Sequence, residues 1–562
     1  MPKESDEARS KASSGSSKAS AQAGSGRAGA LAVLVGAAIL IGGYLLSQEQ
    51  QITIFVVSLD TTRPDHLTAY GYDRETTPTL ERLAREGTRF VNARSTTSWT
   101  LPSHMSLFTG LPADLHNVTI DFQRLDLGWK TMGEIFSEAG FHTVGLFTAP
   151  YLHERFGFDR GMDFYEAMTK NPMAYDLPPR AVDEKMGVLE LASHREVTTP
   201  RVMNRINKYF LPRRKAPKNF FFLHLFDPHY DYLPPQQVAQ QFLDPNYTGP
   251  IDGLGVTQQP EVIHPDMPIA DLDRLRDLYD AEIRFVDDNL SRLMKTIEAE
   301  GLVGSSIVVV TGDHGEEFFE AGRIGHRMTL RDEVLRIPLL FWGPGLIPEG
   351  LVVDDEVALY DVLPTIMDYA DLEPEPTIYG RSLRPLIEGG TLPSRPTHSA
   401  LTFLHRDGPP FYTRHDALVH NGMKYIQRVR VPWSPLDPTR IDNTPDLSTL
   451  EVEIYDLGAD PGELANLADR TDDPRVAGIR QEFMAEQGRQ RAALAAFNPL
   501  GTLEDDDRVP EDMEQMNRWL RALGYAGTED SSASVGTAPA PGGQEAGESG
   551  SGQQLPSTDT DG

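Results

Sequence analysis

The stretch ITIFVVSL, residues Ile52–Leu59, decides the fold class of this chain. It is continuous, apolar and rich in β-branched residues, which is typical of a strand buried on both faces of a parallel sheet. Ser306–Val310 (SIVVV) repeats the pattern much later, and Asn219–Phe226 (NFFFLHLF) is a further strand-like run. Helical stretches such as Thr79–Glu86 and Leu272–Glu298 lie between these runs. The alternation predicts an α/β fold with helices on both faces of the sheet.

The chain after this alternation has a different character. From Asp416 to Leu457 the sequence reads as short strands and turns, which predicts a smaller antiparallel subdomain. Apolar residues recur at helical spacing over Met513–Leu523, so we expect a helix there that packs on the body. Residues 526–562 hold no basic residue and six acids among Gly, Ser, Pro and Gln, which predicts a disordered acidic tail.

The N-terminal part reads as a tail followed by a membrane anchor. Residues 1–27 are rich in Ser, Ala, Gly and Lys and predict a disordered cytoplasmic tail. The uncharged run 28–46 would span about 28 Å as a helix, close to the thickness of the hydrocarbon layer. A cleaved signal peptide is the alternative, but the run is long and lacks a convincing cleavage site. Arg27 and the lysines before it place the N-terminus inside, so we expect a single-pass protein of the cytoplasmic membrane with its globular part outside, in a periplasm-like compartment.

Composition excludes several classes of function. The 562 residues include 52 Lys plus Arg against 83 Asp plus Glu, so the formal net charge is 52 − 83 = −31. A chain this acidic is not expected to hold nucleic acid through its overall charge. The absence of cysteine excludes disulfides, thiolate zinc sites and a cysteine nucleophile.

Polar residues follow two of the predicted strands at the point where each strand ends. Asp60 comes directly after the first strand in VVSLDTTRPDHL, and Asp313 and His314 follow the later strand in IVVVTGDHGEEF. Ligands of open α/β sheets collect outside the carboxyl ends of the strands, so we expect these side chains to face one crevice. Two carboxylates and an imidazole form a mixed oxygen and nitrogen set that suits a divalent metal.

A third segment, WTLPSH, supplies a hydroxyl. Pro102 suits the first turn of a helix, whose free backbone N–H groups form an anion site. Thr100 stands just before it, with its hydroxyl expected to face a bound oxyanion. A threonine hydroxyl is a poor nucleophile unless a base or a metal lowers its pKa, and the metal set above would do so. Taken alone, the segment is best explained by Ser and Thr residues that merely cap the helix.

Taken in order, these motifs resemble the sulfatase-like branch of the alkaline phosphatase superfamily, from Ile52 to about Tyr525. The matching segments are LDTTRPDHL with Asp60, TLPSHMSLFTG with Thr100 in the nucleophile position, FDPHYDY with His229, YDAEIRFVDDNLSRL, TGDHGEE with Asp313 and His314, GHRMTLRDEVLRIPLLFWGPG with His326, DVLPTIMDYADL, GRSLRPLIEG and EIYDLGADPGELANLAD. The resemblance implies an alkaline-phosphatase-like large mixed sheet flanked by helices, plus a small C-terminal antiparallel sheet. We accordingly expect a catalytic domain over 52–395 and a C-terminal subdomain over 396–525. It also implies metal-assisted nucleophilic attack on a sulfate or phosphate ester.

Departures from the family pattern shape the expected chemistry. The family motif has Cys or Ser, which is oxidised to formylglycine, and an Arg four residues later, whereas this chain has Thr100 and His104. Threonine cannot yield formylglycine, and Thr61 replaces the second metal-binding acid. The remaining set resembles the single-metal site of threonine-dependent phosphoglycerol and phosphoethanolamine transferases; its members are Asp60, Thr100, Asp313 and His314. One divalent ion is expected, with Zn²⁺ or Mn²⁺ favoured over Ca²⁺ because an acid is lost and an imidazole gained, and with Ca²⁺ and Mg²⁺ left open.

The other histidines and acids are assigned by position. Family position implies that His229 and His326 approach the ester anion or protonate the leaving group. The alternative is a second metal held by Asp227, His229 and His326. Side chains expected to be structural are His66, His104, His116, His224, Glu282 and Asp287, although His104 could touch the anion in place of the missing Arg. Glu316 and Glu317 are interpreted as a solvated loop pair, with hydrogen bonding to residues of the site as the alternative.

The motifs together predict a membrane-anchored, metal-dependent sulfatase-family hydrolase that cleaves sulfate esters through a covalent intermediate at Thr100. The alternative is a phosphodiesterase, or a phosphoglycerol or phosphoethanolamine type of transferase, with the same nucleophile. The third hypothesis is an inactive domain that binds anionic glycans or lipids. The expected partner is an anionic ester, namely a sulfated or phosphorylated glycan, lipid or small molecule.

Overall fold

The computed structural model describes residues 51–120, 123–168, 198–214, 216–257, 259–405, 411–431 and 445–497. The expected N-terminal tail, the apolar run 28–46, the helix over Met513–Leu523 and the acidic tail 526–562 lie outside these residues. No helix within the described ranges has both the length and the apolarity that crossing a membrane requires. β11 begins at Thr397, while the domain boundaries themselves stay predictions.

The fold is built on an eight-stranded mixed sheet with the strand order β10-β2-β9-β6-β1-β5-β3-β4. Its members are β1 (Ile52–Leu59), β2 (Gly87–Arg94), β3 (His142–Phe147), β4 (Phe164–Ala167), β5 (Lys218–Leu225), β6 (Ser306–Gly312), β9 (Leu339–Trp342) and β10 (Leu351–Ala358). β1 lies at the centre, parallel to β5 and β6, and all eight of its residues are buried. β9 runs antiparallel to β2 and β6, which makes the sheet mixed. The predicted α/β class and the central strand are confirmed.

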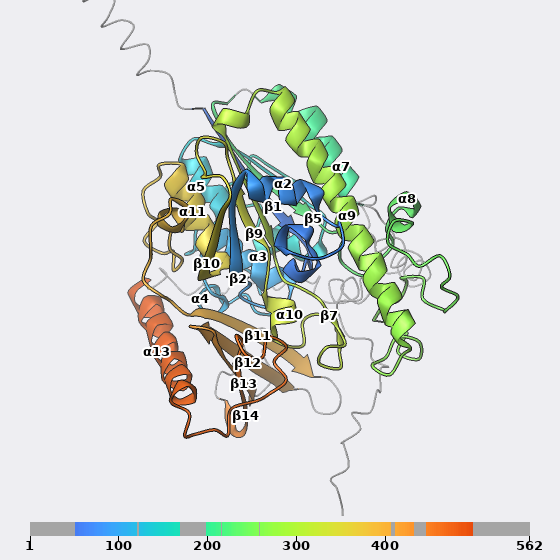
Figure 1. Ribbon diagram of the computed structural model, residues 1–562. Helices are drawn as coiled ribbons and strands as arrows, with labels where there is room; N and C mark the ends of the chain where they lie inside the picture. Colours follow the sequence, from blue (N-terminus) through green and yellow to red (C-terminus); the bar gives the residue numbers. More distant parts are fainter. Residues whose placement is uncertain are drawn as a thin grey trace, which may run out of the picture. The chain divides into compact units, whose positions relative to one another are not determined.

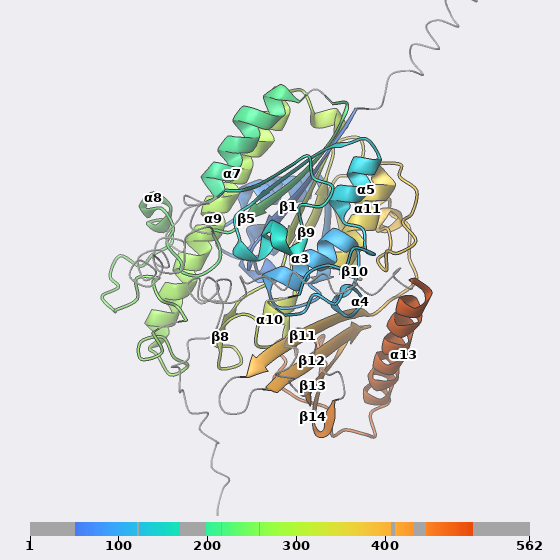
Figure 2. The ribbon, with the colours of Figure 1, turned by 180° about the vertical axis from the view of Figure 1, so that it is seen from behind.

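Helices cover both faces of this sheet (Figures 1 and 2). The α-helices are α2 (Pro78–Arg85), α3 (Thr100–Thr109), α4 (Ala113–His116), α5 (Met132–Glu138), α7 (Thr199–Arg205), α8 (Gln236–Ala239), α9 (Ile269–Ala299), α10 (Asp332–Leu335), α11 (Val362–Tyr369), α12 (Arg384–Ile387) and α13 (Pro474–Phe497). Alternate residues of β1 enter different cores because strand side chains alternate between faces. Ile54 and Val56 pack with α3, α5 and α11, whereas Phe55 and Val57 pack with α2, α7 and α9.

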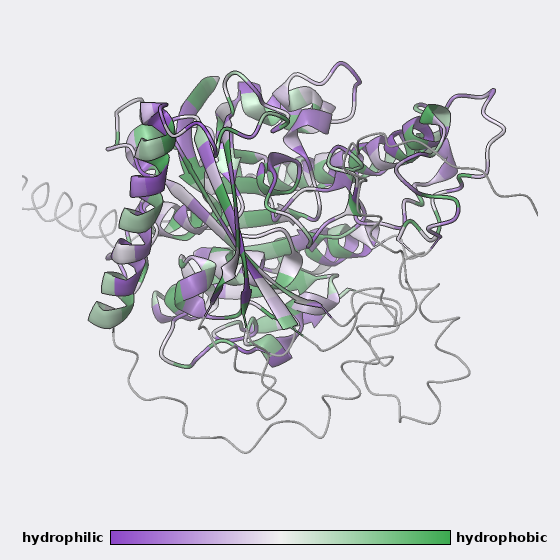
Figure 3. Cartoon of the chain, turned by 90° about the horizontal axis from the view of Figure 1, so that it is seen from below, coloured by the Kyte–Doolittle hydropathy of each residue, from purple (hydrophilic) through white to green (hydrophobic). Residues whose placement is uncertain are grey.

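A second sheet of four antiparallel strands follows in the sequence. It consists of β11 (Thr397–His405), β12 (Phe411–His420), β13 (Met423–Val431) and β14 (Asp446–Asp456), in that spatial order. The strands have 9 to 11 residues, longer than the short strands expected from the sequence. α13 packs on one face of this sheet through Val476, Ile479 and Phe483. In Figure 3, hydrophobic residues (green) concentrate on strands and on the inner faces of helices.

Hydrogen bonds join β11 to the segment that leads into α3. The hydroxyl of Ser399 donates to the carbonyl of Ser95 at 2.7 Å, and the N–H of Ala400 donates to the carbonyl of Thr96 at 2.8 Å. α3 begins only a few residues later, at Thr100. The small sheet therefore helps to hold in place the segment that carries the Thr100 hydroxyl.

Candidate active site

The predicted metal-binding residues converge at one edge of the large sheet. Asp60 follows β1, and Asp313 and His314 follow the neighbouring parallel strand β6, so the ends of both strands meet at the same edge. Thr100 is the first residue of α3 and lies at this edge. The four residues are buried, with at most 1% of their surface exposed. The structure therefore brings together all four members of the predicted set.

Two carboxylate oxygens point at the same imidazole nitrogen. Nε2 of His314 lies 3.3 Å from Oδ2 of Asp313, 3.7 Å from Oδ1 of Asp60 and 3.5 Å from Oγ1 of Thr100. Nδ1 of His314 donates to the carbonyl of Gly315 at 2.9 Å, so Nε2 keeps its lone pair. Asp60 Oδ1 and Asp313 Oδ2 have no hydrogen-bond partner among the described residues. Buried acceptors without donors beside an imidazole lone pair fit the ligand shell of a divalent cation.

Among the described residues, no Lys or Arg side chain neutralises the two carboxylates of this set. Burial raises the pKa of Asp60 well above its usual range, with repulsion from Glu316 as the next cause. Burial, followed by repulsion from Asp60, does the same for Asp313. Within the described part of the chain neither carboxylate forms an ion pair with Lys or Arg. A bound cation would supply the missing charge and favour the ionised carboxylates.

Thr61, which stands where the family has a second acid, acts through its backbone. Its N–H donates to Oδ1 of Asp313 at 3.1 Å, and its carbonyl accepts from the Tyr279 hydroxyl at 2.7 Å. The residue has a φ of 47°, an uncommon conformation for a β-branched side chain. Such strained residues cluster at functional sites. Thr61 thus orients a predicted ligand.

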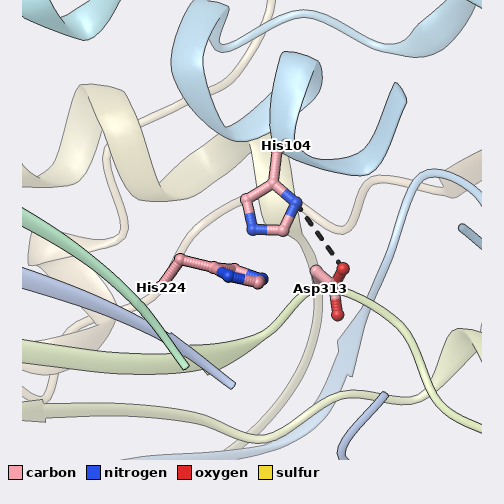
Figure 4. Close-up of side chains that lie close together, drawn as sticks. All are labelled: His104, His224 and Asp313. Atoms are coloured by element: carbon pink, nitrogen blue, oxygen red, sulfur yellow. Dashed lines mark ion pairs between the residues drawn. The ribbon is translucent and has the colours of Figure 1, made fainter. Parts of the chain in front are cut away.

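His104 and His224 form a second group with Asp313, but they serve as braces (Figure 4). Nδ1 of His104 donates to the carbonyl of Thr100 at 2.8 Å, and its Nε2 accepts from the Ser58 hydroxyl at 2.9 Å. A carboxylate only accepts, so Nε2 of His224 donates to Oδ2 of Asp60 at 3.1 Å. Its Nδ1 is bonded to the Thr148 hydroxyl at 3.0 Å.

All four of these imidazole nitrogens are therefore used in hydrogen bonds, and neither ring offers a free lone pair to a cation. Burial also lowers the pKa of His104 well below its usual range, with His224 as the next cause. His104 therefore brings no positive charge to the motif position where the family has Arg. The expectation that His104 and His224 are structural agrees with these contacts.

His326 lies next to His314, and His229 lies next to His326. The ring centroid of His326 is 4.5 Å from that of His314 and 4.9 Å from that of His229. Nδ1 of His229 donates to the carbonyl of Tyr230 at 2.6 Å. Burial lowers the pKa of His326 to about 3, with Arg327 as the next cause. Both predicted acid–base residues thus border the metal-competent set.

Asp227 does not join these histidines. Its two oxygens accept the N–H groups of Thr198 and Thr199 at 2.8 and 2.6 Å, at the start of α7. Among the described residues, the groups that could hold a metal do not include Asp227, His229 or His326. The alternative of a second metal here therefore lacks its carboxylate ligand.

The interpretation of Glu316 and Glu317 as a solvated pair is wrong, because both are fully buried. The TGDHGEE turn packs tightly: a Cβ at Gly315 would lie 2.0 Å from the carbonyl oxygen of Glu333. Glu316 directly precedes, and Glu317 begins, the two-stranded hairpin β7 (Glu317–Phe318) and β8 (Ile324–Gly325). Burial raises the pKa of Glu317 to about 8, and that of Glu316 well above its usual range.

Glu316 has a specific partner. Both of its carboxyl oxygens lie 3.3 Å from Nδ1 of His326. This bond orients the ring so that Nε2 faces away from Glu316. The available signal in the sequence was the acid two residues after His314 in TGDHGEE. Interpreting this segment as a solvated loop concealed the contact of Glu316 with His326.

Arg327 is the second residue that sequence reasoning missed. Its guanidinium lies 4.0 Å over the ring of Trp99, and its Nη1 donates to the Tyr151 hydroxyl at 3.0 Å. Its N–H also donates to the carbonyl of Ser98 at 2.9 Å. A cation is thereby held beside the segment that carries Thr100, in a motif that has lost its own Arg. The available signal was its place directly after His326.

The remaining predicted structural residues make the hydrogen bonds expected of them. Asp287 accepts the N–H groups of Thr79 and Leu80 at the start of α2, at 2.7 and 2.9 Å. Glu282 accepts the N–H of Leu233 at 2.8 Å. The other two pairs are His66 with Asp280, and His116 with Ser106.

Comparison with known proteins agrees with this geometry. The sequence model of the sulfatase family matches residues 52–372. An uncharacterized sulfatase of Escherichia coli, YidJ, is 24% identical over 473 residues, which cover 76% of this chain and 85% of that protein.

Solved structures share the fold. The phosphonate monoester hydrolase of Agrobacterium radiobacter matches with a TM-score of 0.60 at 19% identity, covering 79% of this chain and 96% of its own. A protein solved in complex with its substrate D-glucosamine-2-N,6-O-disulfate matches with a TM-score of 0.60 at 18% identity, covering 80% of this chain and 99% of its own. The large mixed sheet with a small C-terminal antiparallel sheet is therefore the architecture of these enzymes.

Proposed function

Because the chain belongs to the sulfatase family, we propose that it is a metal-dependent hydrolase of sulfate esters with Thr100 as its nucleophile. The observation that carries the proposal is the convergence of Asp60 Oδ1, Asp313 Oδ2 and Thr100 Oγ1 on Nε2 of His314, where the two carboxylate oxygens have no hydrogen-bond partner among the described residues. This arrangement offers a cation three protein oxygens and one nitrogen.

The proposed ligand set is Asp60, Thr100, Asp313 and His314. A divalent cation held there would neutralise the carboxylates and lower the pKa of the Thr100 hydroxyl. Three oxygens with one imidazole favour Zn²⁺ or Mn²⁺, since Ca²⁺ prefers six to eight oxygen ligands. The free N–H groups at the start of α3, which has no side-chain cap, would bind the anionic oxygens of the ester.

The proposed reaction has two steps. The Thr100 hydroxyl gives up its proton to solvent, its oxygen attacks sulfur, the bond between sulfur and the leaving oxygen breaks, and the departing oxygen takes up a proton through His326 or His229. Water then cleaves the threonine sulfate ester, which restores Thr100 and releases sulfate and a proton. The hydrogen bond between Glu316 and Nδ1 of His326 fixes the ring of His326 for the proton transfer. Glu316→Gln should therefore lower kcat roughly tenfold for alkyl esters and much less for nitrophenyl esters, whose leaving groups need no proton.

Phosphoester chemistry is the second candidate, favoured by Thr100 itself. Threonine cannot form the formylglycine with which the family releases sulfate. A plain hydroxyl nucleophile suits phosphoryl transfer, which needs mainly positioning and charge neutralisation. A phosphonate monoester hydrolase among the structural neighbours supports the same direction. The alternative activities are a phosphodiesterase or a phosphoglycerol or phosphoethanolamine type of transferase.

Variants of Thr100 test the nucleophile. Thr100→Ala should lower turnover by roughly 1,000-fold or more with little change in Tm, while Thr100→Ser should keep substantial activity. Sulfate monoesters, phosphate monoesters and phosphodiesters should be assayed side by side. Mass spectrometry after brief exposure to isotope-labelled substrate should find the transferred group on the Thr100 peptide. Turnover of Thr100→Ala at the wild-type rate would refute the assignment.

We propose further that the run 28–46 anchors the protein with residues beyond Ser47 outside the cytoplasm. The support is the length of the apolar run and Arg27 before it. A reporter fused after Tyr525 that is active only when exported should be active in intact cells. Activity of a second reporter, one that works only in the cytoplasm, at the same position would show that the orientation is the reverse of the one proposed.

A further inference from the structure

A cavity of about 440 Å³ lies between the loop that carries His326 and the small antiparallel sheet. Arg323 and Met328 line it from the loop, and the sheet contributes residues from all four strands. The sheet residues mostly alternate along their strands, as Phe403 and His405 do on β11, and so share one face. The opposite face is the one that α13 covers. The cavity thus belongs to the face that α13 leaves open.

The lining is cationic in a chain whose formal net charge is −31. It includes three arginines and a single acid, Glu451. Arg428 is already paired, with Glu451 at 3.5 Å and with Glu453. Arg323 and Arg430 are exposed, and neither forms an ion pair with another described residue. Two guanidiniums therefore face the cavity with unused hydrogen-bond donors, which suit sulfate or carboxylate oxygens.

Aromatic rings stand beside these guanidiniums. The guanidinium of Arg430 lies 4.4 Å over the ring of Phe411, which stacks on His405 at 4.6 Å with an interplanar angle of 10°. Nδ1 of His415, a buried residue of the lining, has no hydrogen-bond partner among the described residues. The cavity therefore combines an apolar ring surface, cationic donors and an unsatisfied imidazole nitrogen. This combination suits a ring-shaped unit that carries an anionic substituent.

The loop links the cavity to the candidate active site. Arg323 precedes His326 by three residues and Met328 follows it by two, so the lining lies within about 11 Å of His326 along the chain. The ring centroid of His326 lies 4.5 Å from that of His314. Figures 1 and 2 both place the β7–β8 hairpin beside the end of β11. A substrate longer than one unit could therefore occupy both places.

We propose that this cavity binds a second anionic unit of the substrate, so that the substrate class is an extended glycan carrying several sulfate or carboxylate groups. The inference rests on the proposed function for the reacting end of that glycan. It assigns Arg323 and Arg430 to recognition of a unit that does not react. Binding energy from such a remote unit lowers the KM of long substrates and leaves short ones unaffected.

The first experiment compares chain lengths. Arg323→Gln and Arg430→Gln should each raise the KM for a sulfated tetrasaccharide about tenfold at low salt, with kcat within about twofold. The matched monosaccharide sulfate and nitrophenyl sulfate should be turned over as by wild type. Arg491→Gln, an exposed arginine on α13, should change neither substrate. Equal losses on long and short substrates, or no loss on the tetrasaccharide, would overturn the proposal.

The second experiment separates this proposal from the proposed function. Calorimetric binding of the sulfated tetrasaccharide and of an uronate tetrasaccharide without sulfate is measured on wild type and on the double variant Arg323→Gln, Arg430→Gln. If wild type turns over none of the esters but binds a tetrasaccharide that the double variant binds at least about tenfold more weakly, the hydrolase assignment fails and the cavity assignment stands. If wild type binds neither tetrasaccharide, the cavity assignment fails. Stronger binding of an anionic phospholipid vesicle or an oligonucleotide to the same arginines would also overturn it.

Discussion

Two groups of buried or half-buried carboxylates in this chain have opposite electrostatic surroundings. At the candidate active site, Asp60 and Asp313 have no Lys or Arg side chain within ion-pair distance among the described residues. Between the large body and the small sheet, Asp332 pairs with Arg94 at 3.0 Å and with Lys424 at 2.9 Å. Burial alone would raise the pKa of Asp332, but Arg94 and Lys424 more than offset it and hold the pKa well below its usual range.

The contrast separates structural charge from functional charge. Lys424 is fully buried and also pairs with Glu463. The charged side chains of this network therefore pair with one another, and they connect β13 to the start of α10. The Asp60–Asp313 pair is left with excess negative charge that folding alone does not balance. A carboxylate that stays unpaired inside a protein is costly unless it binds a cation. The uncompensated group is therefore the one that marks the site.

The largest effect is expected from removing a carboxylate of the uncompensated pair. Asp313→Asn should lower kcat/KM by roughly 1,000-fold or more, because it removes a charged ligand, and metal content per chain should fall with it. Without metal at neutral pH, the variant should be at least as stable as wild type, since one unpaired buried charge is gone. Activity assays, elemental analysis and thermal unfolding in chelator measure the three quantities. If Asp313→Asn kept full metal content and activity, Asp313 would not be a metal ligand, and the proposed difference between the two groups of carboxylates would be wrong.

Breaking the compensated network should affect stability instead. Asp332→Ala leaves Arg94 and Lys424 without their shared partner, and should lower the free energy of unfolding by about 2–3 kcal/mol, less than for a fully buried pair because 12% of the Asp332 side chain is exposed. Activity per folded molecule should stay near wild type. Asp355→Ala, at an exposed position, is the control. Urea unfolding monitored by fluorescence measures the difference, and equal stability of the two variants would show that the network contributes nothing.

Metal removal should separate the groups without any mutation. With free metal at 100 times its Kd, binding stabilises the folded state by about 2.7 kcal/mol, and chelation removes this contribution. Zn²⁺ or Mn²⁺ should restore both activity and Tm better than Ca²⁺. Asp332→Ala should lose as much stability on chelation as wild type does, whereas Asp313→Asn should lose little. If the Tm of wild type were the same with and without chelator, this would contradict a metal bound at Asp60 and Asp313.

The sequence predicted the elements, and the proximity of the proposed ligands, better than the surroundings of those residues. Ile52–Leu59 and Ser306–Val310 are unambiguous because buried parallel strands are apolar along their whole length, and Asp60 and Asp313 follow from the strand ends. The burial of Glu316 was missed because it depends on a turn packed against Glu333, far along the chain. Long-range packing of this kind leaves no local periodicity in the sequence.

Arg327 and the Asp332 network were missed for the same reason. Arg327 gains its role from the rings of Trp99 and Tyr151, which come from distant segments. Asp332 meets Arg94 and Lys424 only when the small sheet packs on the body. Residues such as Asp60 and Asp313 can be identified from their positions in sequence motifs. Whether a basic side chain neutralises a carboxylate depends instead on which residues lie next to it in the folded structure. The sequence alone therefore could not distinguish the two groups of carboxylates.

The smallest expected effect, and the most direct electrostatic test, is the pH dependence of stability. Asp332 has a folded pKa below its unfolded value of 3.8, so its stabilisation is present above about pH 4 and is lost as pH falls through the folded pKa. The stability gap between wild type and Asp332→Asn should thus shrink on acidification.

Asp313 should show the opposite sign in metal-free protein. Its folded pKa is raised, so the wild type is relatively stabilised below about pH 4 and loses that advantage as pH rises through the folded pKa. Metal-free Asp313→Asn should therefore match or trail wild type in acid and gain on it toward neutral pH, by about 1.4 kcal/mol for each unit of pKa difference. Urea unfolding at a series of pH values in chelator measures both slopes. Because titration of Asp332 and Asp313 would move stability in opposite directions, two parallel slopes would mean that the two groups do not differ in charge compensation.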